Sequence, residues 1–76
     1  MTYGYSMKLA HLNEIADANE LGVRLGRVCI ARGIPVMEVA SRLKVRRQTV
    51  YNWFIGFNKP SAKYVDLINE YLAELG

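Results

Sequence analysis

Apolar residues recur at helical spacing along most of the chain. They predict four amphipathic helices: one running up to residue 32, one over 36–43, one over about 47–55 and one after residue 61. The positions expected to face a common core are Leu21, Leu25, Val28 and Cys29, then Val36, Val39, Ala40 and Leu43, then Val50, Trp53 and Phe54, and finally Tyr64, Leu67, Ile68, Tyr71, Leu72 and Leu75. No segment sustains apolar and polar alternation beside a hairpin turn, so strands are not expected.

Residues that favour helix ends stand between these stretches. Gly33 is placed to end the first helix in the left-handed conformation, and Pro35 can open the next helix but cannot continue the previous one. Gly56 would end the third helix, and Ser61 is a suitable N-cap for the fourth. The pattern therefore predicts an all-α fold, a compact bundle of four to five short helices with short connections.

A fifth helix is predicted over residues 7–16. Ser6 would be its N-cap. The residues expected on its apolar side are Met7, Leu12, Ile15 and Ala16. Asp17 or Asn19 would then cap the helix that follows.

Length and composition fit one small folded domain. A chain of 76 residues is near the lower limit for a self-sufficient core, and its apolar share of 51% is typical of a folded protein. We expect a flexible tail over residues 1–6 and a single domain over 7–76. No apolar run approaches the ~18 residues of a membrane span, and the N-terminus lacks the pattern of a secretory signal. The single cysteine, Cys29, suits a reducing compartment, so a cytoplasmic location is expected.

Charge is distributed unevenly along the chain. Residues 21–63 hold nine of the ten basic residues and one acidic residue, a net charge of +8. Residues 1–20 carry −2 and residues 64–76 carry −3, which leaves +3 overall. A basic centre between acidic ends is typical of a surface that binds a polyanion such as a nucleic acid. A solvated surface with no partner is the alternative.

Two short helices joined by three or four residues form the most informative segment. The first would pack through Ala40, whose small side chain allows close helix contact, and the second through Val50 and Trp53. Val45 would fill the corner between them. This arrangement predicts a helix-turn-helix over residues 36–55, whose second helix projects its outer face toward a major groove.

The segment 36–54, VMEVASRLKVRRQTVYNWF, resembles the lambda-type repressor and Cro family of helix-turn-helix regulators. The matching positions are Ala40, Val45, Val50 and Trp53. The spacing from Gly56 to Pro60, followed by an apolar helix, is also similar to the family. The resemblance covers about half of the chain and implies a lambda-repressor-like fold.

The chain departs from the family pattern at several positions. Lys44 occupies the turn position where glycine is common, and Pro35 and Arg46 stand where a capping Ser or Thr is common. Some family members pair an arginine with a glutamate at the positions that Cys29 and Phe54 occupy here. Both partners have become apolar together, which avoids an unpaired buried charge.

The outward face of the third helix follows from its inward one. Its residues are Arg47, Gln48, Tyr51 and Asn52, with Thr49 at the flank. Arginine can bond two acceptors of guanine, and glutamine or asparagine can bond adenine. The resemblance places Arg47, Gln48 and Asn52 where the family reads bases, and Tyr51 is a fourth candidate, against a thymine methyl or a phosphate. The alternative is that Gln48 and Asn52 are ordinary surface polar residues.

Six residues are expected to hold the sugar-phosphate backbone rather than to read bases: Arg42, Arg46, Thr49, Asn58, Lys59 and Lys63. Arg42 and Arg46 flank the corner between the two short helices. The resemblance places Asn58 and Lys59 in a loop where family members commonly contact the backbone. The helix that runs up to residue 32 carries three arginines, which are expected to be solvated: Arg24, Arg27 and Arg32.

Catalysis, metal binding and cofactors are not expected. The chain has one histidine, His11, and one cysteine, Cys29, with no acidic pair placed against them. We expect Cys29 to fill the core and His11 to lie on the surface. Tyr3 and Tyr5 could belong to an arm that touches DNA, although a flexible tail is the preferred interpretation.

The resemblance implies a transcriptional regulator that binds duplex DNA at an operator, of a kind found in phages and prophages, and is nucleoid-associated when bound. A homodimer formed through the C-terminal or the N-terminal helix would place two recognition helices ~34 Å apart on a palindromic site. Two alternatives remain open. One is a DNA-binding module in recombination, DNA packaging or an antitoxin system, and the other is a protein-interaction adaptor on the same fold.

Overall fold

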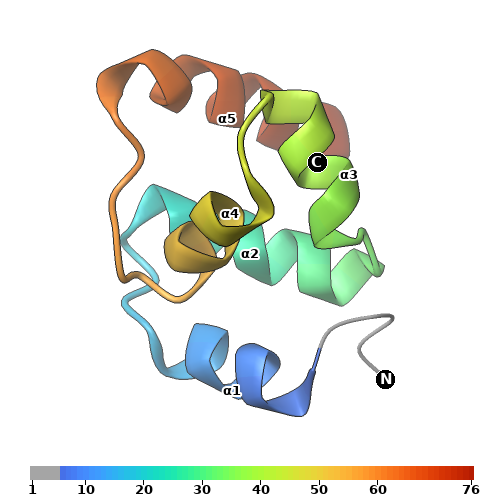
Figure 1. The fold of residues 1–76 in the computed structure, drawn as a ribbon, viewed down its shortest axis with the longest axis vertical. Coiled ribbons are helices and arrows are strands. Elements are labelled where there is room, and N and C mark those ends of the chain that lie inside the picture. The colour runs from blue at the N-terminus through green and yellow to red at the C-terminus, as the bar shows by residue number, and fades with distance from the viewer. Residues whose placement is uncertain (1–5) are drawn as a thin grey trace.

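Five α-helices account for most of residues 6–76, the part of the chain that the computed structural model describes, and no strand occurs there (Figure 1). The helices are α1 (Met7–Ile15), α2 (Leu21–Arg32), α3 (Val36–Leu43), α4 (Arg47–Phe54) and α5 (Ala62–Leu75). The five helices confirm the prediction of an all-α bundle of short helices. Most of the expected flexible tail, including Tyr3 and Tyr5, lies outside the described residues.

The centre of the bundle is α2. It packs against α1, α4 and α5, while α3 packs against α4 and α5. Figure 1 shows α5 across the top of the view and α1 across the bottom, with α2 and α4 between them. The whole measures 30 × 23 × 21 Å, so every helix has one side at the core and one side at the surface.

The predicted helix ends are partly confirmed. The Ser6 side chain accepts a hydrogen bond from the Leu9 N–H at 3.0 Å, so Ser6 is the N-cap of α1 rather than part of a tail. Gly33 ends α2 in the left-handed conformation, with φ 68°. The prediction that Asp17 or Asn19 caps α2 is wrong. Asp17 instead accepts from the Asn19 N–H at 2.9 Å in a local turn, and α2 begins later.

The hydrophobic core combines residues from α2, α3, α4 and α5. Its buried members are Leu25, Cys29, Val36, Val39, Ala40, Leu43, Val50, Trp53, Phe54, Ile68 and Tyr71. All were predicted to face inward. On α2, Leu21 and Val28 are only half-buried. On α5, Leu67 is 44% exposed, because the core reaches one side of that helix and not its whole apolar stripe. Cys29 and Phe54 are both fully buried, as predicted.

The apolar side predicted for α1 is wrong in two of its four positions. Met7 is 85% exposed and Ile15 is 66% exposed. Leu9, half-buried, packs against the core instead, and Asn13 is buried. The reason is that α1 packs through the i, i+4 pair Leu9 and Asn13, so the polar residue and not the apolar end faces α2.

A tight turn joins α3 to α4. Lys44 adopts the left-handed conformation with φ 57° and ψ 47°, as expected for a residue that replaces glycine, at a cost of about 1 kcal/mol. Its N–H donates to the carbonyls of Ala40 and Ser41, which ends α3. Val45 then packs half-buried against the core. Arg46 precedes α4 without a side-chain capping bond, as its residue type suggested.

Candidate nucleic-acid interface

The inner side of α4 is held by three buried side chains and by a flat face of α2. Val50 and Phe54 are fully buried and Trp53 is 3% exposed. Gly22 and Gly26 lie four residues apart on α2, and both are buried. A Cβ atom at Gly22 would lie 2.7 Å from the Cβ of Trp53 and 2.8 Å from its carbonyl oxygen. The two glycines therefore let α4 approach α2 more closely than any side chain would allow.

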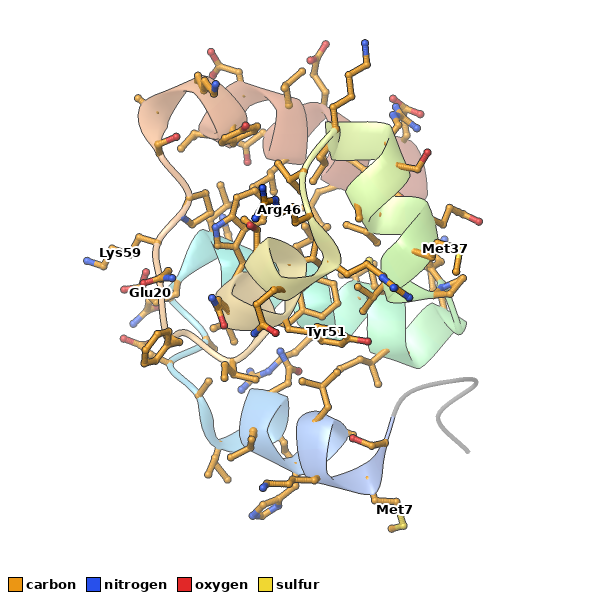
Figure 2. All side chains as sticks on the ribbon, viewed as in Figure 1. Met7, Glu20, Met37, Arg46, Tyr51 and Lys59 are labelled. Atoms are coloured by element: carbon orange, nitrogen blue, oxygen red, sulfur yellow. The ribbon has the colours of Figure 1, made fainter. Side chains whose placement is uncertain are left out.

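The outer side of α4 is polar and basic. Its exposed side chains are at its start: Arg46, Arg47 and Gln48. Those further along are half-buried: Thr49, Tyr51 and Asn52. Figure 2 shows Arg46 above α4 and Tyr51 below it in that view. The Tyr51 side chain packs against the core because it stands three residues before Phe54 and so flanks the buried side of the helix.

Two amide side chains on α4 are joined by a hydrogen bond. Gln48 Nε2 donates to Asn52 Oδ1 at 3.0 Å, across one turn of the helix. The bond leaves the Gln48 carbonyl oxygen as an acceptor and the Asn52 amino group as a donor. The pair therefore presents one acceptor and several donors from a restrained position, the complement of an adenine edge in a major groove.

Positive charge gathers at the start of α4. Within residues 6–76, neither Arg46 nor Arg47 makes an ion pair or a side-chain hydrogen bond. The first turn of α4 also holds no acidic residue, so the partial positive charge of the helix N-terminus adds to the two guanidinium groups. Both arginines are thus available to an anionic partner.

The loop after α4 is tied to the helix end. The backbone N–H groups of Phe57 and Asn58 both donate to the Asn52 carbonyl, at 2.9 and 3.3 Å. This brings Asn58 against α4 beside one of the predicted base-reading residues. Lys59 follows, 79% exposed, with its Nζ 3.5 Å from Glu20 Oε1 (Figure 2). A pair this exposed is weak, so Lys59 can exchange the carboxylate for another anion.

Two of the predicted backbone-contacting residues contact aromatic rings of α5, the helix to which Lys63 itself belongs. Arg42 pairs with Glu74, and its guanidinium carbon lies 4.7 Å from the centre of the Tyr71 ring. Lys63 Nζ lies 5.0 Å from the Tyr64 ring centre. The structure therefore gives Arg42 partners within the bundle, whereas Arg46, Arg47, Gln48, Asn52 and Asn58 come together on one helix and its loop.

Arg27, expected to be solvated, instead binds the end of α1. Its Nη2 atom donates to the Glu14 carbonyl at 2.8 Å and to the Ala16 carbonyl at 3.1 Å. The last carbonyls of a helix have no partner within the helix, and a cation there is favourable. The expectation of a merely solvated side chain is wrong for Arg27, because α1 folds back over α2.

Asn13 was not singled out by its position in the sequence. Its Nδ2 atom donates to the Val23 carbonyl at 3.1 Å and to the Phe54 carbonyl at 2.6 Å. It is thereby bonded to both α2 and α4. An asparagine in a short polar stretch gives no signal of burial, but the four-residue spacing of Gly22 and Gly26 would have indicated a close helix contact on α2.

Titratable groups offer little chemistry in this fold. Burial, with a smaller effect of Glu38, raises the pKa of the Cys29 thiol from 9.0 to about 12, so the thiol stays protonated at neutral pH. His11 is exposed, as expected. No three His, Cys, Asp or Glu side chains of residues 6–76 are grouped as metal ligands would be. Within the same span, no helix has the length and apolar character needed to cross a membrane.

No family model, curated protein or solved structure matches this chain. The resemblance of residues 36–54 to the repressor and Cro family therefore stays a prediction from the residues.

Proposed function

We propose that this chain is a sequence-specific transcriptional regulator of the repressor and Cro type, which binds duplex DNA by placing α4 in the major groove of an operator. In this proposal α3, the turn and α4 form a helix-turn-helix over residues 36–55. One observation carries it. Val50, Trp53 and Phe54 anchor the inner side of α4, while the side chains of Arg46 and Arg47 face outward and make no ion pair or hydrogen bond within residues 6–76.

The proposed base-reading set is Arg47, Gln48 and Asn52, with Tyr51 as a weaker fourth. Arg47 suits the two acceptors of a guanine, and the bonded amides of Gln48 and Asn52 suit an adenine. The half-buried Tyr51 can offer only part of its ring to a thymine methyl. Each good pairing of this kind is worth about 1–3 kcal/mol of discrimination against a wrong base.

The proposed backbone-holding set is Arg46, Thr49, Asn58 and Lys59, with Lys63 at its edge. These residues belong to the basic centre of the chain, whose net charge of +8 over residues 21–63 favours a polyanion. Arg42 joins this set only by exchanging its exposed pair with Glu74 for a phosphate, as Lys59 would exchange its pair with Glu20.

The test is selection of binding sites from random duplexes, followed by single substitutions. Arg47→Ala and Gln48→Ala should each relax preference at one position and cost about 1–3 kcal/mol on the selected site. Lys59→Ala should weaken binding to every duplex and lower the salt slope by about 1. Lys8→Ala is the matched control, since it removes one exposed positive charge on α1 and should change neither quantity.

Three results would each contradict a part of the proposal. Failure of the wild-type chain to enrich any sequence would favour the adaptor alternative, in which the fold binds a protein partner. Identical behaviour of the Arg47, Gln48 and Lys59 variants would remove the division into base-reading and backbone-holding residues. A selected site that maps outside promoters would favour recombination, packaging or an antitoxin system.

We further propose that the protein binds a palindromic site as a homodimer. Two surfaces support this: α1 leaves Met7 and Ile15 exposed, and α5 leaves Leu67 exposed at 44%. Exposed apolar residues favour association where they form one contiguous patch, so the proposal requires the exposed residues of two copies to meet across the interface. Sedimentation that finds only monomer, both free and on DNA, would contradict this proposal.

A further inference from the structure

Among residues 6–76, Asn13 is the one buried residue with an amide or charged side chain, at 3% exposed. Its amide donates to the carbonyl of Val23 in α2 and to the carbonyl of Phe54, the last residue of α4. A buried amide that lost these partners would carry a large desolvation cost, so its position is restrained by them. Asn13 therefore links the start of the chain to the end of α4, 41 residues away.

The surroundings of Asn13 hold it against this end of α4. A Cβ atom at Gly26 would lie 2.6 Å from Asn13 Nδ2 and 2.8 Å from Phe54 Cγ, so the glycine makes room for both. Arg27 fastens the end of α1 through the carbonyls of Glu14 and Ala16. Three helices thus meet at one amide, and none of these contacts lies on the outer face of α4.

We propose that Asn13 is a positioning residue that sets how α4 presents its outer face to DNA. The proposal rests on the proposed function. Helix α4 has eight residues, about 12 Å of length, so a shift at Phe54 moves the whole helix rather than bending it. Base contacts tolerate misplacement of only about 0.5 Å. A small displacement of the buried end is therefore enough to misplace Gln48 and Arg47.

The same displacement reaches the loop. The Asn52 carbonyl, two residues before Phe54, accepts from the N–H groups of Phe57 and Asn58. A moved helix end carries Asn58 with it. Loss of the Asn13 bonds should consequently weaken the match to a particular sequence, while Arg46, Arg47 and Lys59 keep their charge and hence their attraction to any duplex.

The experiment measures the ratio of affinities for the selected duplex and for a scrambled duplex of the same length. The variants are Asn13→Ser, whose single hydroxyl hydrogen can serve at most one of the two carbonyls, and Asn13→Ala, which serves neither. Ile68→Val is the matched control, because it trims the fully buried core on α5 and leaves the Asn13 bonds in place. All chains are compared with enough trimethylamine oxide to keep them folded, as checked by circular dichroism.

We expect the ratio to fall about tenfold in Asn13→Ala and by less in Asn13→Ser, with affinity for the scrambled duplex unchanged. A merely structural role would lower both affinities together through the folded fraction, and the ratio would stay at the value of Ile68→Val. That result would overturn the inference and leave the proposed function standing. A wild-type chain that selects no sequence would instead overturn the proposed function.

Hydrogen exchange gives a second measurement that needs no DNA. The Ile55 and Phe57 amides donate to the Tyr51 and Asn52 carbonyls at the end of α4. In Asn13→Ala their exchange should accelerate more than that of the α5 amides. Equal acceleration in both helices would show that Asn13 contributes to global stability only. That result would overturn the inference even if no DNA sequence is selected.

Discussion

The substitution Gly22→Ala should change the free energy of unfolding through two opposing effects. Replacing glycine by alanine inside a helix ordinarily stabilises a protein by about 1 kcal/mol, because glycine has the poorer helix propensity. At Gly22, however, the new Cβ would lie 2.7 Å from Trp53 Cβ, 2.8 Å from Trp53 O and 3.1 Å from Trp53 C. These atoms are fixed to the backbone of α4, so no side-chain rotation can relieve the overlap.

The magnitude follows from the size of the overlap. Overpacking of a tight core costs about 1–3 kcal/mol, and contacts with backbone atoms at these distances belong at the upper end. After the helix-propensity gain of about 1 kcal/mol, Gly22→Ala should destabilise the protein by about 2 kcal/mol. For a chain of this size that corresponds to a melting temperature roughly 8–16 °C lower.

Urea denaturation followed by circular dichroism measures the effect, with the slope m checked for constancy. The control is the exposed Arg24, two residues further along α2. There the alanine variant should be more stable than the glycine variant by about 1 kcal/mol, which shows the ordinary order of the two residues in this helix. If Gly22→Ala is as stable as the wild type, the backbone of α4 at Trp53 does not lie in contact with Gly22 of α2.

Two further predictions concern other parts of the fold. The side chains of Arg42 and Glu74 are 45% and 57% exposed, so a double-mutant cycle to alanine should give a coupling free energy below about 1 kcal/mol. A larger coupling would mean that the packing of α3 against α5 depends on this ion pair. Folding raises the pKa of Cys29 from 9.0 to about 12, so the unfolded chain releases this proton first. The free energy of unfolding should therefore fall above pH 9 by up to about 1.4 kcal/mol per pH unit. In urea titrations, Cys29→Ala should remove the part of this fall that comes from the thiol. An identical fall in the wild type and in the variant would contradict the prediction.

Much of the fold could be predicted because local rules and the core agree along the chain. The bounds 36–43 of α3 follow from an apolar pattern of period 3.6, and Gly33 and Lys44 take the left-handed conformations that their places after helices require. The inward residues Val50, Trp53 and Phe54 leave the candidate site on the other face of α4. Periodicity alone thus selects that face.

The remainder of the site could not be predicted because it depends on contacts between distant segments. Arg42 has the charge and place of a phosphate contact, yet Glu74, 32 residues later, pairs with it. Exposed Met7 and Ile15 show that apolar residues on a short helix do not establish which side it buries. Neighbouring helices decide that, through the area they leave to be covered.

Helical periodicity and charge are local properties, so the residues alone are enough to predict the helices, the inward faces of α3 and α4, and the basic and amide side chains of residues 46–52. The close approach of α4 to α2 and the bond from Asn13 to the end of α4 emerge only in the folded bundle. A glycine face and a buried amide acquire these roles when another helix comes within about 3 Å of them, and no local pattern encodes that approach.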